Sequence, residues 1–226
     1  MQIIGLVGGV ASGKSLVARQ LAELGASLLD ADRAGHDVLR LPEVEAAARA
    51  RWGSRIFAAD GHIDRRRLAG IVFAPTPDGP PQREYLEQLT HPEIGRRLEQ
   101  QIGQLAAAGA AAAVLDAAVM LEAGWDRLCE HLIYVDVPRA VRMQRAHGRG
   151  WSEEDFTARE NAQQPLAGKR CRAGWVIDNS GTPEQTRVQV QQCWQRLVGS
   201  ETTASRGCEP PDFSHNATDK GDTPGG

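Results

Sequence analysis

A short, mostly apolar run at the start of the chain, Gln2–Val7, leads directly into the glycine-rich run Gly8–Ser15. The second run reads GGVASGKS and matches the phosphate-binding pattern G-x-x-x-x-G-K-[ST] in full. The first run is rich in aliphatic residues and is typical of a buried parallel strand. Apolar residues at helical spacing follow in Lys14–Leu24, where we expect a helix. This order of strand, glycine loop and helix predicts a fold built around a site for a nucleoside triphosphate.

The residue types of the glycine-rich run suit the binding of a triphosphate. Glycine lets the main chain approach the phosphates closely and take the φ and ψ values that point successive N–H groups at them. The positive end of the following helix adds to the attraction. Lys14 is expected to contact the β- and γ-phosphates and to act in catalysis, and the Ser15 hydroxyl to be a ligand of Mg²⁺. The predicted ATP-binding residues of the loop are Gly9, Val10, Ala11, Ser12, Gly13, Lys14, Ser15 and Leu16.

Other apolar runs, separated by helical patterns, predict the rest of the fold. Strands are expected at 26–30, 113–116, 132–137 and 175–178, and helices at 43–52, 83–108, 139–147 and 183–198. This alternation predicts a parallel sheet with helices on both faces, the three-layer α/β/α fold of a P-loop NTPase. The proline-rich stretch Pro75–Pro81 is expected to be a surface loop. Small and polar residues dominate residues 200–226, which we expect to form a disordered tail.

The composition argues against several classes of function. A net charge of −3 gives no reason to expect the basic surface of a nucleic-acid-binding protein. No apolar stretch reaches the ~18 residues of a membrane span, and no basic segment of a secretory signal precedes the first apolar run. The four cysteines form no C-x-x-C pair and are expected to be thiols in a reducing compartment. We therefore expect a cytoplasmic protein with small-molecule substrates and no nucleic-acid or membrane partner.

Two aspartates, Asp30 and Asp32, end the second predicted strand. Ligands of parallel sheets bind at the carboxyl ends of the strands, so an acceptor beside the phosphates would meet these side chains. Asp32 is the preferred candidate for the group that accepts a hydroxyl proton or orients the acceptor. The alternative is that either aspartate only caps a helix that we expect to begin at Ala34.

Charged residues in the second half of the chain extend the predicted site. Asp116 ends the strand at 113–116 and could hold Mg²⁺ through its waters; the alternative is a structural role. Arg145 and Arg149 lie on and just after the helix that begins at Arg139, and are candidates for stabilising the charge of a transferred phosphoryl group. The alternative for these arginines is a solvated basic face. Arg142 is expected on the outer face of the helix.

These features favour a small-molecule kinase over other P-loop proteins. The chain has no N-K-x-D box, the motif with which GTPases recognise guanine. It has instead an acid pair soon after the loop, arginines late in the chain, and a helical segment between them. The non-enzyme alternative is a nucleotide-dependent binding module or switch, which would bind a nucleotide without phosphorylating a small molecule.

Several separated stretches together resemble the dephospho-coenzyme A kinase family. They are Gly5–Ser15, Asp30–Asp32, Asp64–Leu68 with Ile71–Phe73, Thr90–Pro92, Glu122 with Gly124, Val135–Val137, Gln144–Arg145, Gln163 and Val176–Gly181. The resemblance covers residues 1–198. It departs from the family pattern at Ala11, where a glycine is usual, at Ala118–Met120, where Pro-Leu-Leu is usual, and at Gly150, where an aspartate is usual.

The resemblance implies phosphorylation of the ribose 3′-hydroxyl of dephospho-coenzyme A by ATP, which is the last step of coenzyme A synthesis. It implies a kinase domain over residues 1–199. Its core would comprise 1–33, 110–145 and 174–199, with a helical acceptor-binding insertion over 34–109 and a lid over 146–173. Asp32 would be the base, Arg65 and His91 would line the acceptor side, Arg149 would reach the ATP phosphates, and Asn179 would lie near the adenine. The alternative is a kinase for another small acceptor, such as a nucleoside monophosphate or a sugar.

Overall fold

A five-stranded parallel sheet forms the centre of the protein in a computed structural model that describes residues 1–74 and 76–199. The strand order is β2-β3-β1-β4-β5, and every neighbouring pair is parallel. The strands are β1 (Gln2–Gly8), β2 (Ser27–Leu29), β3 (Ala112–Asp116), β4 (His131–Asp136) and β5 (Trp175–Asp178). The predicted α/β fold class is therefore confirmed. The predicted tail at 200–226 lies outside the described residues.

Nine α-helices connect and cover the strands within the described residues. They are α1 (Lys14–Glu23), α2 (Ala31–Val38), α3 (Pro42–Trp52), α4 (Arg65–Val72), α5 (Gly79–Ala107), α6 (Arg139–His147), α7 (Glu153–Asn161), α8 (Leu166–Arg172) and α9 (Pro183–Val198), with short 3₁₀ turns at Ser54–Ile56 and Trp125–Leu128. Side-chain hydrogen bonds cap the N-termini of several of these helices. Ser152 with Asp155 begins α7, and Thr182 with Gln185 begins α9, each pair forming a capping box.

Two predicted helix boundaries are wrong, and each error has a local cause. The expected loop Pro75–Pro81 ends at residue 78, because α5 begins at Gly79 and holds its two prolines in the first turn. Proline is tolerated there, since the first N–H groups of a helix have no intrahelical acceptor. The helix expected from Ala34 begins at Ala31, because the Asp30 carboxylate accepts the Arg33 N–H at 2.8 Å. Asp30 therefore caps α2, three residues before the expected start.

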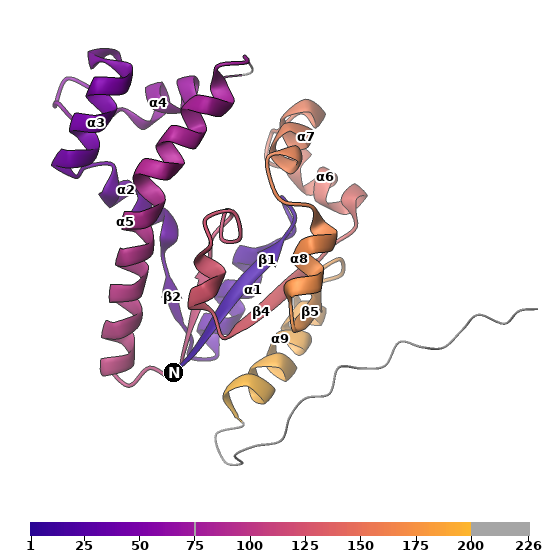
Figure 1. Cartoon of the computed structure of the whole chain (residues 1–226). Helices are drawn as coiled ribbons and strands as arrows, with labels where there is room; N and C mark the ends of the chain where they lie inside the picture. Colours follow the sequence, from indigo (N-terminus) through magenta and orange to yellow (C-terminus); the bar gives the residue numbers. More distant parts are fainter. Residues whose placement is uncertain (75, 200–226) are drawn as a thin grey trace, which may run out of the picture.

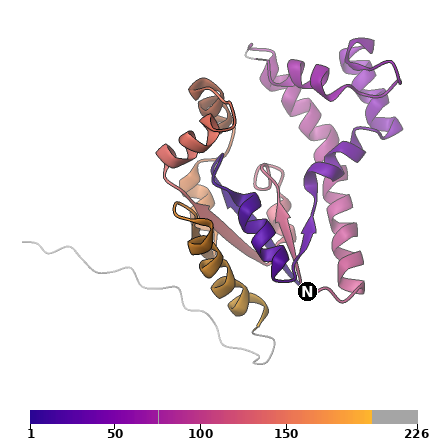
Figure 2. The same ribbon diagram turned by 180° about the vertical axis from the view of Figure 1, so that it is seen from behind.

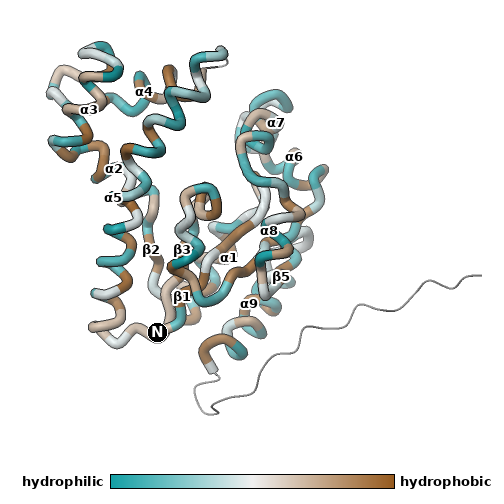
Figure 3. Tube along the Cα trace, in the orientation of Figure 1, coloured by the Kyte–Doolittle hydropathy of each residue, from teal (hydrophilic) through white to brown (hydrophobic). Residues whose placement is uncertain are grey.

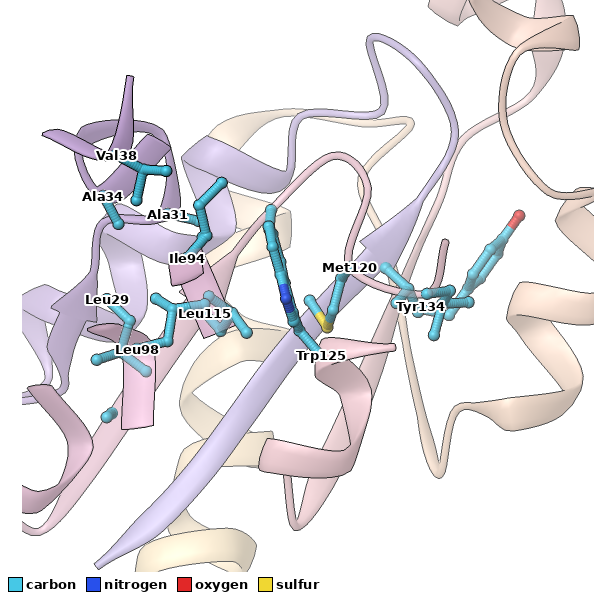
Figure 4. Close-up of a cluster of buried hydrophobic side chains, with 14 of the residues drawn as sticks. Leu29, Ala31, Ala34, Val38, Ile94, Leu98, Leu115, Met120, Trp125 and Tyr134 are labelled. Carbon is cyan, nitrogen blue, oxygen red and sulfur yellow. The ribbon is translucent and has the colours of Figure 1, made fainter. Parts of the chain in front are cut away.

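Helices cover both faces of the sheet (Figures 1 and 2). Each face buries a separate apolar cluster. Ile4 and Leu6 point to one face, where α1 and α9 pack through residues such as Leu21 and Val190. The other face packs against α2, α5 and the segment after β3. Figure 4 shows this second cluster, with Trp125 between Ile94 and Met120. Burial on both faces explains why the central strands are almost continuously apolar.

Two smaller apolar clusters lie beside the main core. One holds together α3, α4 and the turn between them, and consists of Ala48, Trp52, Ile56, Phe57, Leu68 and Val72. The other joins the phosphate loop to α6 and α7 through Val10, Ala146 and Phe156. In Figures 1 and 2, α3 and α4 lie on the side of the sheet where β2 is, and α6 and α7 lie on the side of β4 and β5. Figure 3 shows that α7 is largely hydrophilic along its length, so this lone phenylalanine is an important part of its attachment.

None of the described helices combines the length and the apolar character that crossing a membrane requires.

Candidate active site

The loop between β1 and α1 takes a conformation that requires glycine at several positions. Gly8 and Gly13 have φ values of 154° and 87°. A Cβ atom at Gly13 would collide with the Asn179 amide, and one at Gly9 would lie 2.7 Å from Nη1 of Arg142. Ala11 takes a φ of 59°, the only positive value among the described residues other than glycine. Side chains therefore pack closely behind the loop.

Lys14 begins α1 and turns back over the loop. Its Nζ lies 3.5 Å from the Gly9 carbonyl oxygen. Burial lowers the pKa of this ammonium group, and nearby Asp116 opposes the shift only in part. A buried cation without a fully compensating partner is well suited to bind an anion.

Ser15 and Asp116 meet at the junction of β1 and β3. The Ser15 hydroxyl donates a hydrogen bond of 2.8 Å to Oδ2 of Asp116. The register of the sheet explains the contact, because Asp116 pairs with Leu6 near the end of β1. A hydroxyl and a carboxylate at adjacent strand ends are oxygen donors of the kind that Mg²⁺ prefers. The structure thus brings together the two residues predicted to hold the metal.

Arg145 and Asn179 support the loop from the side of β5. Arg145 donates to the Asn179 carbonyl at 2.7 Å and to the Ser12 carbonyl at 3.4 Å. The Asn179 side-chain amide donates to the same Ser12 carbonyl at 2.7 Å and accepts from Thr186. Both predicted residues therefore lie against the phosphate loop. Arg149, in the turn after α6, has an exposed side chain farther along the chain.

The predicted acceptor residues come from α2, α4 and α5. Asp32 is exposed in the first turn of α2, where β2 ends. His36 lies one turn later on the same face of the helix, and its Nδ1 is 3.5 Å from Nη1 of Arg65. Asp32 and Arg65 are thus brought to one face of α2. His91 lies on α5, which packs against α2.

The ring of His91 packs edge-on against Trp125 at 5.3 Å between centroids. Burial lowers the pKa of His91, and the nearby Glu87 carboxylate opposes this shift. The imidazole is therefore biased towards its neutral form. Trp125, which carries this contact, is itself buried in the cluster between the sheet and α5.

One prediction on α6 is wrong. Arg142 was expected on the outer face of the helix, but it is 2% exposed and lies behind the phosphate loop. It donates to the carbonyls of Val137 and Val10 and pairs with Glu160. The sequence held a signal for this burial: Arg142 and Ala146 have the i, i+4 spacing of an inward face, although an arginine occupies the first position.

A second buried cation, Lys169 on α8, was not identified from the sequence. It is 3% exposed, and its Nζ lies 3.1 Å from Oε1 of Gln163 and 3.4 Å from Oε1 of Glu122. Its charge contributes to the lowered pKa of Lys14, so it lies within electrostatic range of the phosphate site. The basic run around it reads as a surface helix in sequence, which explains why the residue was missed.

A pocket of about 640 Å³ lies beside the loop, between the end of β4 and the segment that joins α7 to α8. Its wall includes Gly9, Val10, Tyr134, Asp136, Gln163 and Leu166. The phosphate loop thus borders a space large enough for part of a nucleotide-sized ligand. This space lies on the side of the loop away from β3.

The parallel sheet and the loop with its buried lysine, serine–aspartate pair and flanking arginine define a P-loop kinase. A sequence model of the dephospho-CoA kinase family matches residues 2–185. The chain belongs to that family.

Curated relatives agree with this assignment. The dephospho-CoA kinase of Symbiobacterium thermophilum is 38% identical over 205 residues, which cover 89% of this chain and 83% of the relative. That of Geobacter sulfurreducens is 39% identical over 87% of this chain and 98% of the relative.

Solved structures support the fold. A Thermus thermophilus protein superimposes with a TM-score of 0.73 and 31% identity, over 90% of this chain and 98% of the other. A shikimate kinase from Acinetobacter baumannii has a TM-score of 0.50 at 17% identity, over 90% of this chain and 96% of the other, and shows the fold alone.

Proposed function

We propose that the protein transfers the γ-phosphoryl group of ATP to the ribose 3′-hydroxyl of dephospho-coenzyme A and so makes coenzyme A and ADP. The observation that carries this proposal is the contact of Ser15 with Asp116 beside the buried Lys14, within a chain whose family membership extends over residues 2–185. These groups form the donor half of a phosphoryl-transfer site. The family supplies the identity of the acceptor.

On the donor side, residues 9–16 would bind the phosphates of ATP through main-chain N–H groups. Lys14 would place its charge on the β- and γ-phosphates, where developing negative charge is stabilised. Arg145 would support the nucleotide from its position on the Ser12 and Asn179 carbonyls. Arg149 would reach the phosphates once the proposed lid, residues 146–173, closes, and Asn179 would lie near the adenine.

The Ser15 hydroxyl and the Asp116 carboxylate fit a magnesium ion that is held mainly by phosphates and water. Among the described residues no group of three or more His, Cys, Asp or Glu side chains could hold a metal. Mg²⁺ in phosphoryl-transfer sites commonly binds through one or two protein ligands and the substrate. When bound, the ion would neutralise charge on the transferred group.

On the acceptor side, Asp32 would accept the proton of the 3′-hydroxyl. Arg65 reaches the same face of α2 and offers a guanidinium group to the phosphates of the acceptor. The neutral imidazole of His91, on α5, would hydrogen-bond to the acceptor. Arg65 and His91 belong to the proposed insertion, residues 34–109, and Asp32 lies at its border with the core, so the acceptor would bind between the insertion and the core.

The test is formation of coenzyme A by the purified protein with ATP, Mg²⁺ and dephospho-coenzyme A. We expect ADP and coenzyme A in equal amounts, and no turnover by Lys14→Ala. A panel of nucleoside monophosphates and sugars, assayed by ADP release, tests the alternative acceptors. Faster turnover of any of them than of dephospho-coenzyme A would contradict the proposal. The cytoplasmic location and the absence of nucleic-acid and membrane partners stay predictions.

A further inference from the structure

Arg142 has an environment that is unusual for an arginine, since its side chain is 2% exposed. Three acceptors surround its guanidinium group. Nε donates to the Val137 carbonyl at 3.1 Å, Nη1 donates to the Val10 carbonyl at 3.3 Å, and Nη2 pairs with Oε1 of Glu160 at 2.7 Å. A buried charge is retained at low free-energy cost only when it is paired and hydrogen-bonded in this way.

One of these three acceptors, the Val10 carbonyl, belongs to the phosphate loop, and the guanidinium group also packs beside Gly9. The guanidinium group lies so close to Gly9 that a Cβ atom there would be 2.7 Å from Nη1. The hydrogen bond to Val10 fixes the direction of that carbonyl. Because a peptide unit is planar and trans, the N–H of Ala11 must then point the opposite way. Arg142 therefore sets the orientation of a main-chain N–H group in the part of the loop that binds phosphate.

The third contact of Arg142 reaches α7. Glu160 accepts from Arg142 and also from Arg139, whose Nε lies 2.9 Å from Oε2. Phe156, one turn before Glu160, is fully buried against Val10 and Ala146. Burial raises the pKa of Glu160, but hydrogen bonds from Arg139 and Arg142 outweigh it, so the pKa lies below its ordinary value. The carboxylate is therefore charged at neutral pH and pairs with Arg142.

We infer that Arg142 is a positioning residue of the phosphate loop, and that its ion pair with Glu160 makes helix α7 part of the support of that loop. The orientation of the loop's N–H groups is thus coupled to the position of α7. The affinity of the loop for the triphosphate of the nucleotide therefore depends on this coupling. The inference rests on the proposed ATP site.

The test separates positioning from stability by means of four variants. Arg142→Met removes the contacts with the loop and leaves Glu160 paired with Arg139 alone. The double variant with Arg142→Met and Glu160→Met removes both charges, and replacement of a whole buried pair by apolar residues commonly preserves stability. Arg142→Lys keeps the charge, but one ammonium group cannot span the positions of three guanidinium contacts. Arg139→Met is the matched control, because Arg139 also binds Glu160 but makes no contact with the loop.

Calorimetry with ATP and Mg²⁺ gives the affinity, and thermal unfolding gives the stability. We expect the double variant to unfold near the wild-type temperature yet to bind ATP about tenfold more weakly, the effect of losing a charge-assisted hydrogen bond. Arg142→Lys should show the same weakening, with a raised KM for ATP and a nearly unchanged kcat. Arg139→Met should keep its ATP affinity within about twofold.

Wild-type ATP affinity in both the double variant and Arg142→Lys would overturn the inference while leaving the proposed function intact. Absence of ATP binding by the wild-type protein would overturn both. If the double variant fails to fold, Arg142→Lys decides the question alone.

Discussion

Asp32 is the residue whose chemistry can be tested most directly. It is exposed at the start of α2, free to approach a hydroxyl group, and distant in sequence from the nucleotide contacts. Asp32→Asn should lower kcat by about 10²–10⁴-fold, the usual contribution of a general base, with little change in ATP affinity. Steady-state kinetics and calorimetry measure the two quantities. Asp37→Asn, on the same helix, is the control and should keep its activity; full activity of Asp32→Asn would remove Asp32 as the base.

Lys14 should make ATP binding depend on pH in a defined way. Burial lowers its pKa below the ordinary 10.5, whereas a bound triphosphate raises it. Between the lowered pKa and 10.5, the ligand-free protein has lost a proton that the complex retains. ATP binding should therefore take up a proton between the lowered pKa and 10.5, and none through Lys14 well below that range.

Calorimetry in two buffers with different heats of ionisation measures this proton uptake. The Lys14→Arg variant keeps a cation that does not titrate in this range and should show no uptake. For the same reason the unfolded wild-type chain binds more protons than the ligand-free folded protein there, so stability should rise with pH across that range. Equal proton uptake by Lys14→Arg and the wild type would assign the titration to another group.

Ala11 shows how the loop tolerates a residue other than glycine. Its φ of 59° lies in the left-handed region, which is strained by about 1–2 kcal/mol for a residue with a Cβ atom. Ala11→Gly should relieve this strain, although the greater freedom of glycine in the unfolded chain offsets about 0.4–1 kcal/mol of the gain. We expect a net stabilisation of up to about 1 kcal/mol, or a Tm higher by about 2–4 °C. An unchanged or lower Tm in calorimetry would show that the greater freedom of glycine in the unfolded chain outweighs the relief of strain in the loop.

At the scale of elements, the attachment of α7 depends on Phe156, which is fully buried although its helix is otherwise mostly polar. Phe156→Ala should lower stability by about 3–5 kcal/mol, the usual result of emptying such a site. A loosened α7 should also admit water to the phosphates, so more ADP should form than coenzyme A. Phe73→Ala, at a 66% exposed position, is the stability control and should change the free energy of unfolding by no more than about 0.5 kcal/mol. A strict one-to-one product ratio in Phe156→Ala would argue against a role of α7 in excluding water.

The sequence predicted the elements whose signals are local. Strand β5 and helix α9 begin and end where expected, at 175–178 and 183–198, because the apolar run is short and Thr182 caps a proline-started helix. The Ser15–Asp116 contact was also within reach, since both residues follow strands that lead to the same edge of a parallel sheet.

What the sequence did not predict depends on contacts between distant segments. Arg142 looks like a surface residue until the phosphate loop, 132 residues earlier, packs over it. Lys169 likewise becomes buried only because Glu122, from the segment after β3, lies opposite. The periodicity of a sequence does not show which charged side chains pair with distant residues, because it assigns every charged side chain to an exposed face.

At the scale of the whole molecule, the outer part of the proposed acceptor segment, α3 and α4, has a small apolar cluster of its own, whereas α2 and α5 pack on the sheet. The cluster around Leu68 and Trp52 joins α3 to α4, and it is distinct from the two clusters that flank the sheet. Regions with their own small core can open without unfolding the rest of the protein. Helices α3 and α4 should therefore respond to mutations in this small cluster separately from the sheet that carries the phosphate loop.

Leu68→Ala tests this separation, because Leu68 is 2% exposed within the small cluster. The substitution should cost about 2–5 kcal/mol locally. Hydrogen exchange should then lose protection in α3 and α4 while β1 and α1 keep theirs, and KM for dephospho-coenzyme A should rise at least several-fold with ATP affinity unchanged. Leu28→Ala makes the same chemical change at a 50% exposed position and should leave all three measurements near wild type. A parallel loss of ATP affinity in Leu68→Ala would mean that the small cluster and the core open as one cooperative unit, because Leu39 and helix α5 contact both clusters.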